Sequence, residues 1–494
     1  MTRKRVLIVN CYFDHDRTRV ARPLKVPQAM APVYLAGALS RELCDVKVHS
    51  ELASGPLEDP KSFAWADMLV LTGLTNSFDR FLHLTAYART VNPQVIVVAG
   101  GPPVRALPKL AQRYFDYACL GDVEELRDVV RDGFGPSYVA EQMVPRYDLA
   151  PGRLPLGYLE STRYCNFACD FCSLTAEKRA YRNHGGDEIR RQMYALGRHG
   201  TVLFLDNNFY GNDRTRFFAR LDTIRELHEE GCFKRWGALV TSDFFSKPEN
   251  LWRARESGCA QLFTGLESFD PKWLASVNKN QNNTASPIRT IVDTLEAGIL
   301  YAYPLLLDVY NRTLAELRAE LEFVTGTPEI TLPAFVGIPI PILGTPLFRS
   351  MARAGRLLPS VKLRDMDSTN LVSNPRDPLH EVTDFLRDLA SFRSYRRRIV
   401  RHSLGFARRY AGVLPPFPLT VALGNAAMLC AEGLVTGSLA SKGRAVRTHV
   451  STTEALDPTY TPAFRIDPRY ARHFDPTMVT DPGGELTDAV LEAA

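Results

Sequence analysis

The stretch Ser161-Thr-Arg-Tyr-Cys-Asn-Phe-Ala-Cys-Asp-Phe-Cys172 places three cysteines, Cys165, Cys169 and Cys172, at the spacing C-x3-C-x2-C. Three thiolates this close together on one loop can bind three irons of a [4Fe–4S] cluster. The fourth iron then has no protein ligand and stays open to a small molecule, which is what one-electron chemistry on S-adenosylmethionine (SAM) needs. The stretch therefore predicts an iron–sulfur centre with these cysteines as metal ligands and catalytic residues.

Two other uses of the three thiols compete with the cluster. A disulfide would leave one thiol over, and no feature of the sequence indicates an oxidising compartment. A structural zinc site needs four tetrahedral ligands. His184 is the candidate for the fourth, but it lies twelve residues beyond Cys172 and follows a basic stretch. We favour the cluster, and the zinc site stays the alternative.

The length and composition predict a multidomain protein of the reducing cytoplasm. The chain has 494 residues, more than one ordinary domain, and we expect three domains at 1–148, 149–360 and 361–494. Its formal net charge of +5 is too close to balance to indicate a nucleic-acid partner. The N-terminus has no signal-peptide pattern, and no run of about 18 apolar residues predicts a spanning helix. We therefore expect a cytoplasmic protein.

The first region alternates short apolar runs with helical stretches. This pattern is typical of an α/β fold, a doubly wound, Rossmann-like parallel sheet with helices on both faces. The apolar runs that predict strands are Val6–Val9, Met68–Leu71, Val95–Gly101 and Ala118–Gly121. Ligands of such sheets lie beyond the carboxyl ends of the strands, where glycines allow a close approach. A dinucleotide ligand is disfavoured because no G-x-G-x-x-G motif follows the first strand.

The middle region predicts a second parallel arrangement, a partial (β/α)6 barrel of TIM type that is open on one side. Six runs are expected to form its strands: Pro155–Glu160, Val202–Leu205, Trp236–Val240, Gln261–Glu267, Tyr303–Leu307 and Ala334–Ile338. Active sites of barrels lie at the carboxyl ends of the strands. Polar residues stand at three successive strand ends: Asp206, Asn207, Asn208, Ser242, Asp243, Glu267 and Ser268. Their oxygens suit the ammonium and ribose groups of SAM, although any one of them could instead cap a helix.

Several of these segments resemble the radical SAM superfamily, in particular its cobalamin-dependent members of the hopanoid-methylase type. The resemblance includes the cysteine spacing and the aromatic Phe171 before the last cysteine. It covers the middle region through Leu205–Asn212, Phe263–Phe269, Asn278-Lys279, Gln281-Asn282, Ala297-Gly298 and Pro341–Phe348. Gly185-Gly186-Asp187-Glu188 looks like the SAM-amine motif of other radical SAM families, but it stands one strand too early. The resemblance implies that SAM contacts Phe171, Asp206, Asn207, Asn208, Ser242, Asp243, Glu267 and Ser268.

The first region resembles the cobalamin-binding domain that precedes many radical SAM domains. The matching pieces are Gly100-Gly101-Pro102 and Gly121-Asp122-Val-Glu124-Glu125. The resemblance implies a cobalamin site at Thr72, Gly73, Gly100, Gly101, Pro102, Gly121 and Glu124. The motif D-x-H-x-x-G, which supplies a histidine ligand to cobalt in other cobalamin proteins, is absent after the first strand. His15 stands in that loop at a different spacing, and we expect it to be a surface loop residue.

The last region is expected to be mostly helical. A single helix with a basic face is predicted over Val382–Ala407, and an apolar stretch follows at Val413–Val435. A basic face beside an apolar segment could contact a membrane peripherally, or the helices could cap the barrel. The segment from about residue 451 is rich in Pro, Thr and Asp and predicts a surface tail.

The resemblance implies an enzyme with three cofactors: a [4Fe–4S] cluster, SAM and cobalamin. We expect reductive cleavage of SAM and methylation of an unactivated carbon through methylcobalamin, with an external electron donor of the flavodoxin or ferredoxin type. The same architecture can instead serve ring formation, rearrangement, carbon–carbon coupling or oxidation. A third hypothesis is an iron–sulfur or zinc protein that senses or binds. The substrate, a small specialised metabolite or a lipid, and the oligomeric state are not written in the sequence.

Overall fold

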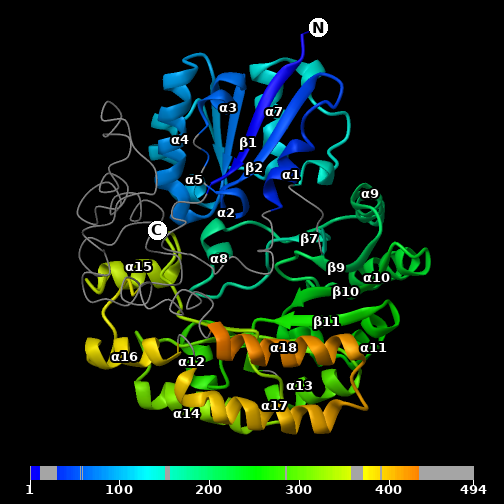
Figure 1. Ribbon diagram of the computed structural model, residues 1–494, viewed down its shortest axis with the longest axis vertical. Helices are drawn as coiled ribbons and strands as arrows, with labels where there is room; N and C mark the ends of the chain where they lie inside the picture. The colour runs from blue at the N-terminus through cyan, green and yellow to red at the C-terminus, as the bar shows by residue number, and fades with distance from the viewer. Residues whose placement is uncertain are drawn as a thin grey trace. The chain divides into compact units, whose positions relative to one another are not determined.

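The computed structural model describes residues 2–11, 30–55, 57, 59–150, 156–283, 286–357, 371–389 and 392–432, which form two compact units (Figure 1). Unit 1 contains the described residues within 2–150 and 341–357, and unit 2 contains those within 156–340 and 371–432. The domain boundary expected after residue 360 lies outside the described residues, as do His15 and the tail from residue 451.

The sheet of unit 1 has five parallel strands in the order β2-β1-β3-β4-β5. Their bounds are β1 (Lys4–Asn10), β2 (Cys44–Ser50), β3 (Met68–Thr72), β4 (Ile96–Gly100) and β5 (Tyr117–Cys119). The four predicted strands and the doubly wound α/β fold are confirmed. The order reverses between β1 and β3, and ligands of such sheets bind at this point.

Strand β2 has no counterpart among the predicted strands. It lies at the edge of the sheet, beside β1. Its sequence, Cys-Asp-Val-Lys-Val-His-Ser, lacks the continuous apolar run that identifies the buried strands. An edge strand has a neighbour on one side only and tolerates charged residues, so its pattern is weak.

Helices connect the strands of unit 1 and cover the sheet. They are α1 (Ala31–Ala36), α2 (Glu51–Ser54), α3 (Pro60–Trp65), α4 (Phe78–Val91), α5 (Pro102–Ala106), α6 (Pro108–Tyr114) and α7 (Leu126–Gly133). Helix α15 (Pro346–Arg353) belongs to the same unit but comes from the later segment. Buried residues of the strands and α7 form one core, which includes Val6, Ile8, Val70, Val98 and Val130. This core holds the carboxyl ends of β1, β3 and β4 together at one edge.

Unit 2 is a partial barrel of parallel strands. Five strands form one sheet in the order β12-β11-β10-β9-β6, and β13 and β14 form a second parallel pair. The bounds are β6 (Gly157–Leu159), β9 (His199–Phe204), β10 (Phe233–Val240), β11 (Cys259–Thr264), β12 (Leu300–Ala302), β13 (Pro304–Leu306) and β14 (Phe335–Gly337), with a hairpin of β7 (Thr162–Arg163) and β8 (Arg182–Asn183). The partial (β/α)6 barrel is confirmed. Its fifth strand divides at Tyr303 into β12, which pairs with β11, and β13, which pairs with β14.

The helices of unit 2 follow the strands as a barrel requires. They are α8 (Ser173–Glu177), α9 (Gly186–Leu196), α10 (Arg214–Glu229), α11 (Pro248–Glu256), α12 (Pro271–Ser276), α13 (Pro287–Glu296), α14 (Leu314–Gly326), α16 (Leu379–Leu389), α17 (Arg396–Tyr410) and α18 (Pro416–Glu432). Among the described residues, none of the helices is long and apolar enough to cross a membrane.

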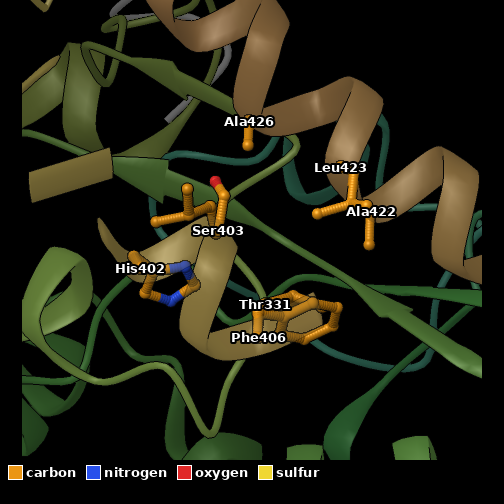
Figure 2. A pocket seen from close by; sticks show the side chains of 8 residues that line it. Thr331, His402, Ser403, Phe406, Ala422, Leu423 and Ala426 are labelled. Carbon is orange, nitrogen blue, oxygen red and sulfur yellow. The ribbon is translucent and has the colours of Figure 1, made fainter. Parts of the chain in front are cut away.

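The single helix predicted over Val382–Ala407 is wrong, because the structure has two helices there, α16 and α17. Phe392 lies between them with φ 47°, a left-handed conformation that a right-handed helix cannot contain. Helices α17 and α18 pack on each other, and α18 also contacts β11 and β12. Figure 2 shows the small pocket between these two helices, where His402 and Phe406 face Ala422 and Ala426; none of the predicted site residues lines it.

Candidate functional site

The three cysteines lie on a loop that begins beyond the first barrel strand, β6, and β7. Tyr164, directly before Cys165, has φ 64°, which is unusual for a residue other than glycine. Cys169 is buried, and Cys165 and Cys172 are half-buried. The Cys169 carbonyl accepts hydrogen bonds from the Cys172 N–H (3.1 Å) and the Thr175 hydroxyl (2.8 Å). The loop is therefore folded back on itself around Cys169.

The electrostatics of the thiols fit a cluster. Burial, together with the charges of Cys172 and Cys169, raises the pKa of Cys165 to about 11. Three thiolates so arranged need cations beside them, and irons bound by sulfur donors provide these. In the part of the chain that the structure describes, no three His, Cys, Asp or Glu side chains converge as ligands of a single metal ion would. Three thiolate donors on one loop can each bind one iron of a cluster.

His184, the candidate for a fourth zinc ligand, is held between two carboxylates. Its Nε2 lies 3.3 Å from Glu160 Oε2, and its Nδ1 lies 3.1 Å from Glu188 Oε2. Although burial lowers the pKa of His184, the hydrogen bonds and charges of Glu160 and Glu188 raise it to about 9. A protonated imidazole has no lone pair for a metal. Glu188 belongs to the motif that stands one strand too early, and it serves here as a partner of His184.

Phe171 packs inside unit 2. Its ring stacks on Trp273, with the centroids 6.4 Å apart and the planes at 19°. The ammonium of Lys279 lies 5.4 Å from the centre of the Phe171 ring. A contact between Phe171 and SAM stays a prediction.

Asp206, at the end of β9, is tied to the start of the cysteine loop. One carboxylate oxygen accepts from the N–H groups of Ser161 (2.7 Å) and Thr162 (2.9 Å), and the other accepts from the Ser161 hydroxyl. Burial raises the pKa of Asp206, whereas the charge of Arg220 and these hydrogen bonds lower it. The geometry gives Asp206 a positioning role, and its contact with SAM stays a prediction.

Asn208 bridges the cysteine loop and the next strand. It is fully buried, and its Nδ2 donates to Asn166 Oδ1, directly after the first cysteine, at 2.7 Å. Its Oδ1 lies 3.1 Å from the Thr241 hydroxyl, at the end of β10. The neighbouring Asn207 is exposed. Of the two asparagines, Asn208 therefore joins the hydrogen bonds around the cysteine loop, whereas Asn207 points to the surface.

Asp243 offers an acceptor that the protein leaves open. Its Oδ1 accepts from the Thr241 hydroxyl, whereas its Oδ2 is buried without a hydrogen-bond partner among the described residues. Burial raises the pKa of Asp243. Buried polar atoms are normally satisfied, so this oxygen suits a ligand donor such as the ammonium or a ribose hydroxyl of SAM. The adjacent Ser242 instead donates to Asn282 Oδ1 at 2.7 Å.

Glu267 and Ser268 follow β11 but turn to different partners. Glu267, with φ 65°, forms a buried ion pair with Lys279, whose Nζ lies 2.9 Å from Glu267 Oε1. Ser268 donates to Glu320 Oε1 at 2.6 Å, and Glu320 is paired with the buried Arg312. Ser268 thus belongs to an interior network, and Glu267 faces the loop described next.

The segment Asn278-Lys-Asn-Gln-Asn282 belongs to the site, although the predicted site residues do not include it. Gln281 Nε2 donates to Cys169 Sγ at 3.3 Å, and Asn278 Nδ2 donates to Ala168 O at 2.8 Å. Although burial lowers the pKa of Lys279, the charges of Glu267 and Cys169 raise it. Five successive amide and ammonium side chains are an uncommon pattern, and this was the signal in the sequence that could have identified the segment.

The predicted cobalamin residues of unit 1 gather at the carboxyl edge of its sheet. A Cβ on Gly73 would lie 3.0 Å from the Cys11 carbonyl oxygen, and one on Gly101 would lie 3.2 Å from the Gly73 carbonyl oxygen. Gly101 has φ 99°. The chain segments after β1, β3 and β4 therefore touch backbone to backbone. Leu74 beside them is 68% exposed, so the described residues of this edge offer apolar surface.

The remaining predicted cobalamin residues lie around this edge. Thr72 ends β3, and its carbonyl accepts from the Cys11 N–H at 2.7 Å. Gly100 ends β4, and Pro102 begins α5. The Gly121 N–H donates to the Glu125 carboxylate, and Glu124 lies in the same turn. The structure brings these residues to one edge, where small side chains and open backbone fit a corrin ring, and their contacts with cobalamin stay predictions.

Comparison with known proteins now assigns both regions. Residues 21–131 match the B12 binding domain, and residues 159–321 match the radical SAM superfamily. The chain contains a B12-binding domain and a radical SAM domain. A radical SAM domain implies a [4Fe–4S] cluster and SAM, and a B12-binding domain implies cobalamin.

Relatives of this chain include two named methyltransferases. Hopanoid C-2 methylase of Rhodopseudomonas palustris is 26% identical over 60% of the chain, and the match spans 59% of the methylase. Bacteriochlorophyllide d C-12(1)-methyltransferase of Chlorobaculum tepidum is 23% identical over 59% of the chain and 67% of its own length. The structure of the cobalamin-dependent SAM radical enzyme OxsB with aqua-cobalamin bound shares the fold, with a TM-score of 0.58 and 14% identity over 99% of the chain and 84% of that chain.

Proposed function

We propose that the protein is an enzyme that cleaves SAM reductively and methylates an unactivated carbon of a small molecule with the help of cobalamin. The observation that carries the proposal is the pairing, on one chain, of a three-cysteine loop held by Gln281 and a B12-binding domain with glycines at the carboxyl edge of its sheet. The two named relatives are methyltransferases, which supports methyl transfer over other radical outcomes. The bound cofactors would supply the radical and the methyl group, and the chain supplies binding and order.

In unit 2 we assign different residues to the cluster, to SAM and to the cysteine loop. Cys165, Cys169 and Cys172 would hold the cluster, and Asp243 would accept a hydrogen bond from SAM through its open Oδ2. Asp206 and Asn208 fix the loop on which the cysteines stand. Their hydrogen bonds are formed inside the protein, so the loop keeps its shape before SAM arrives.

The proposal can be tested without knowing the substrate. Anaerobically purified protein is supplied with iron, sulfide and cobalamin, and is then given a reductant and SAM with a deuterated methyl group. We expect about four irons per chain, retained corrinoid, release of 5′-deoxyadenosine, and transfer of the labelled methyl group to the corrinoid with formation of S-adenosylhomocysteine. SAM cleavage without labelled corrinoid would replace methyl transfer by rearrangement, coupling or oxidation. Absence of SAM cleavage would contradict the enzyme assignment.

We further propose that an acidic flavodoxin- or ferredoxin-type protein of the cytoplasm delivers the electron. We also propose that α17 contacts a membrane surface. The segment Arg393–Ala431 has seven arginines and no acidic residue, whereas the whole chain has a formal net charge of only +5. The outward face of α17 also exposes Val400 (55%) and Leu404 (64%) between its arginines. Such a face suits anionic lipid head groups and shallow acyl contact.

Vesicle co-sedimentation tests the membrane contact. We expect binding to vesicles that contain one quarter phosphatidylglycerol, weaker binding in high salt, and none to pure phosphatidylcholine. Arg397→Glu/Arg401→Glu should lose the binding. Arg216→Glu/Arg289→Glu is the matched control, since it makes the same charge change at exposed arginines elsewhere in unit 2. Equal loss in both double variants would contradict a specific surface.

A further inference from the structure

The segment from Val277 to Asn282 (the brace) lies against the cysteine loop at several points. The Val277 carbonyl accepts from the Asp170 N–H at 3.1 Å, and Asn278 donates to the Ala168 carbonyl. At its other end Asn282 Nδ2 donates to the carbonyls of Gly265 and Leu266, at 2.9 and 2.8 Å. The brace therefore joins the cysteine loop to the end of β11.

Two side chains of the brace bring an amide and an ammonium group to the cysteine loop. Gln281 donates to Cys169 Sγ at 3.3 Å, and both residues are buried. The ammonium of Lys279 lies over the ring of Phe171, the residue directly before Cys172. Its side chain is 8% exposed, so its charge acts in a medium of low dielectric.

The charge of Lys279 is balanced by a residue that is held there under strain. Glu267 carries φ 65°, a conformation that costs a non-glycine residue of order 1 kcal/mol or more. A Cβ on Gly265 would lie 2.9 Å from both Lys279 Nζ and Glu267 Oε1, so this glycine leaves the space for the ion pair. An unpaired buried ammonium would be far more costly. If this position served packing alone, two apolar residues would fill it at lower cost than a buried ion pair.

We propose that Lys279 and Gln281 raise the reduction potential of the cluster, and that Glu267 moderates this effect. Reduction adds one electron, and hence one negative charge, to the cluster. A nearby positive charge and an N–H···S hydrogen bond favour the reduced form, whereas a nearby carboxylate opposes it. Lys279, Gln281 and Glu267 act here as positioning residues through the cysteines, and they form no bond to iron. The proposal rests on the cluster of the radical SAM domain and is independent of methyl transfer.

The test measures the midpoint potential of the cluster in the reconstituted full-length protein. The protein is held at set potentials without substrate, and the electron paramagnetic resonance signal of the reduced cluster is recorded at each potential. Lys279→Gln and Gln281→Met should shift the midpoint to lower potential, and Glu267→Gln should shift it to higher potential. We expect each charge variant to change the ratio of reduced to oxidised cluster at a fixed potential by about tenfold, which is 59 mV for one electron. Lys279→Gln/Glu267→Gln should lie between the two single variants.

The matched control is Lys234→Gln, which removes an exposed lysine of β10 and should leave the potential unchanged. Shifts of the same sign for Lys279→Gln and Glu267→Gln, or no shift in either, would overturn the proposal. Iron content is measured in parallel. If Lys279→Gln does not retain iron, the potential is measured in Lys279→Arg and Glu267→Gln instead. Lys279→Arg keeps a positive charge as a guanidinium, and Glu267→Gln keeps the ammonium of Lys279. A wild-type protein that binds no cluster would instead contradict the proposed function.

Discussion

The two parallel sheets of this protein each end in a carboxyl edge prepared for a cofactor, but the edges are built in opposite ways. In unit 2 the strand ends carry charged and amide side chains that bond to the cysteine loop or to the segment beside it: Asp206 bonds to Ser161, Asn208 to Asn166 and Glu267 to Lys279. In unit 1 glycines follow or end β3 and β4, and Gly73 and Gly101 bring backbone against backbone. One edge is defined by its chemistry and the other by its shape.

This difference suits what each edge would bind. A cluster and SAM are compact and charged, so fixed charges and hydrogen bonds order them. A corrin ring is broad and flat, so it needs a surface from which side chains are absent. Substitutions at the first edge should therefore act through electrostatics and at the second through steric contact. The following predictions test that contrast, from the largest expected effect to the smallest.

The largest effect is expected for Cys169→Ala. Removing the buried thiol leaves one iron without its ligand, so iron content should fall below about one tenth of the wild-type value and SAM cleavage should stop. Corrinoid retention by unit 1 should persist, because its edge shares no residue with the cysteine loop. Cys232→Ala, which removes a thiol outside the loop, should behave as wild type. Retained SAM cleavage in Cys169→Ala would refute the cluster ligand assignment.

A smaller effect is expected for His184→Gln. Because the pKa of His184 is raised to about 9 from 6.5, its ion pairs contribute stability that is fully present below pH 6.5 and is lost as the pH rises through 9. Urea unfolding should show the variant less stable than wild type by up to about 3 kcal/mol at pH 6, with the difference vanishing near pH 10. His228→Gln is the control. A difference that grows with pH would contradict a protonated His184.

The edge of unit 1 is probed by Gly101→Ala against Gly135→Ala. Both glycines have positive φ, 99° and 107°, but a Cβ meets the Gly73 carbonyl oxygen at the first and nothing within 4 Å at the second. Each variant should lose about 1 kcal/mol of stability from backbone strain. Gly101→Ala alone should also retain less corrinoid after gel filtration, with unchanged iron content. Equal corrinoid retention in both variants would argue against a cofactor at this edge.

The smallest expected effects separate two residues that were both predicted to contact SAM. Asp243→Asn should weaken SAM binding about fivefold, since the open carboxylate oxygen loses its charge, which corresponds to about 1 kcal/mol. Ser268→Ala should lower stability by about 1 kcal/mol through its bond to Glu320, and SAM affinity should not change. Isothermal titration of SAM and thermal unfolding measure the two quantities. Weaker SAM binding in Ser268→Ala would return that residue to the SAM site.

The sequence predicts what depends on local pattern and misses what depends on tertiary contact. The buried strands and the six barrel strands follow from their apolar runs, and the cysteine loop from its spacing. Edge strand β2 is missed because it lacks the continuous apolar run of the buried strands, and the break before α17 is missed because a left-handed Phe392 has no compositional signal. The brace is missed as part of the site because Gln281 and Cys169 are far apart along the chain and meet only through the fold.

The division of the fifth barrel strand makes a seam in the wall of unit 2. The sheet that ends at β12 continues to β13 through the Leu306 N–H, which donates to the Glu267 carbonyl at 2.8 Å. Glu267 thus closes the seam with its backbone and holds Lys279 with its side chain. Local opening of the barrel along this line would pull the counter-ion away from the cysteine loop at the same moment. Slow amide exchange at Leu306 would therefore show that the hydrogen bond across the seam is closed, and also that Glu267 still pairs with Lys279 beside the cysteine loop.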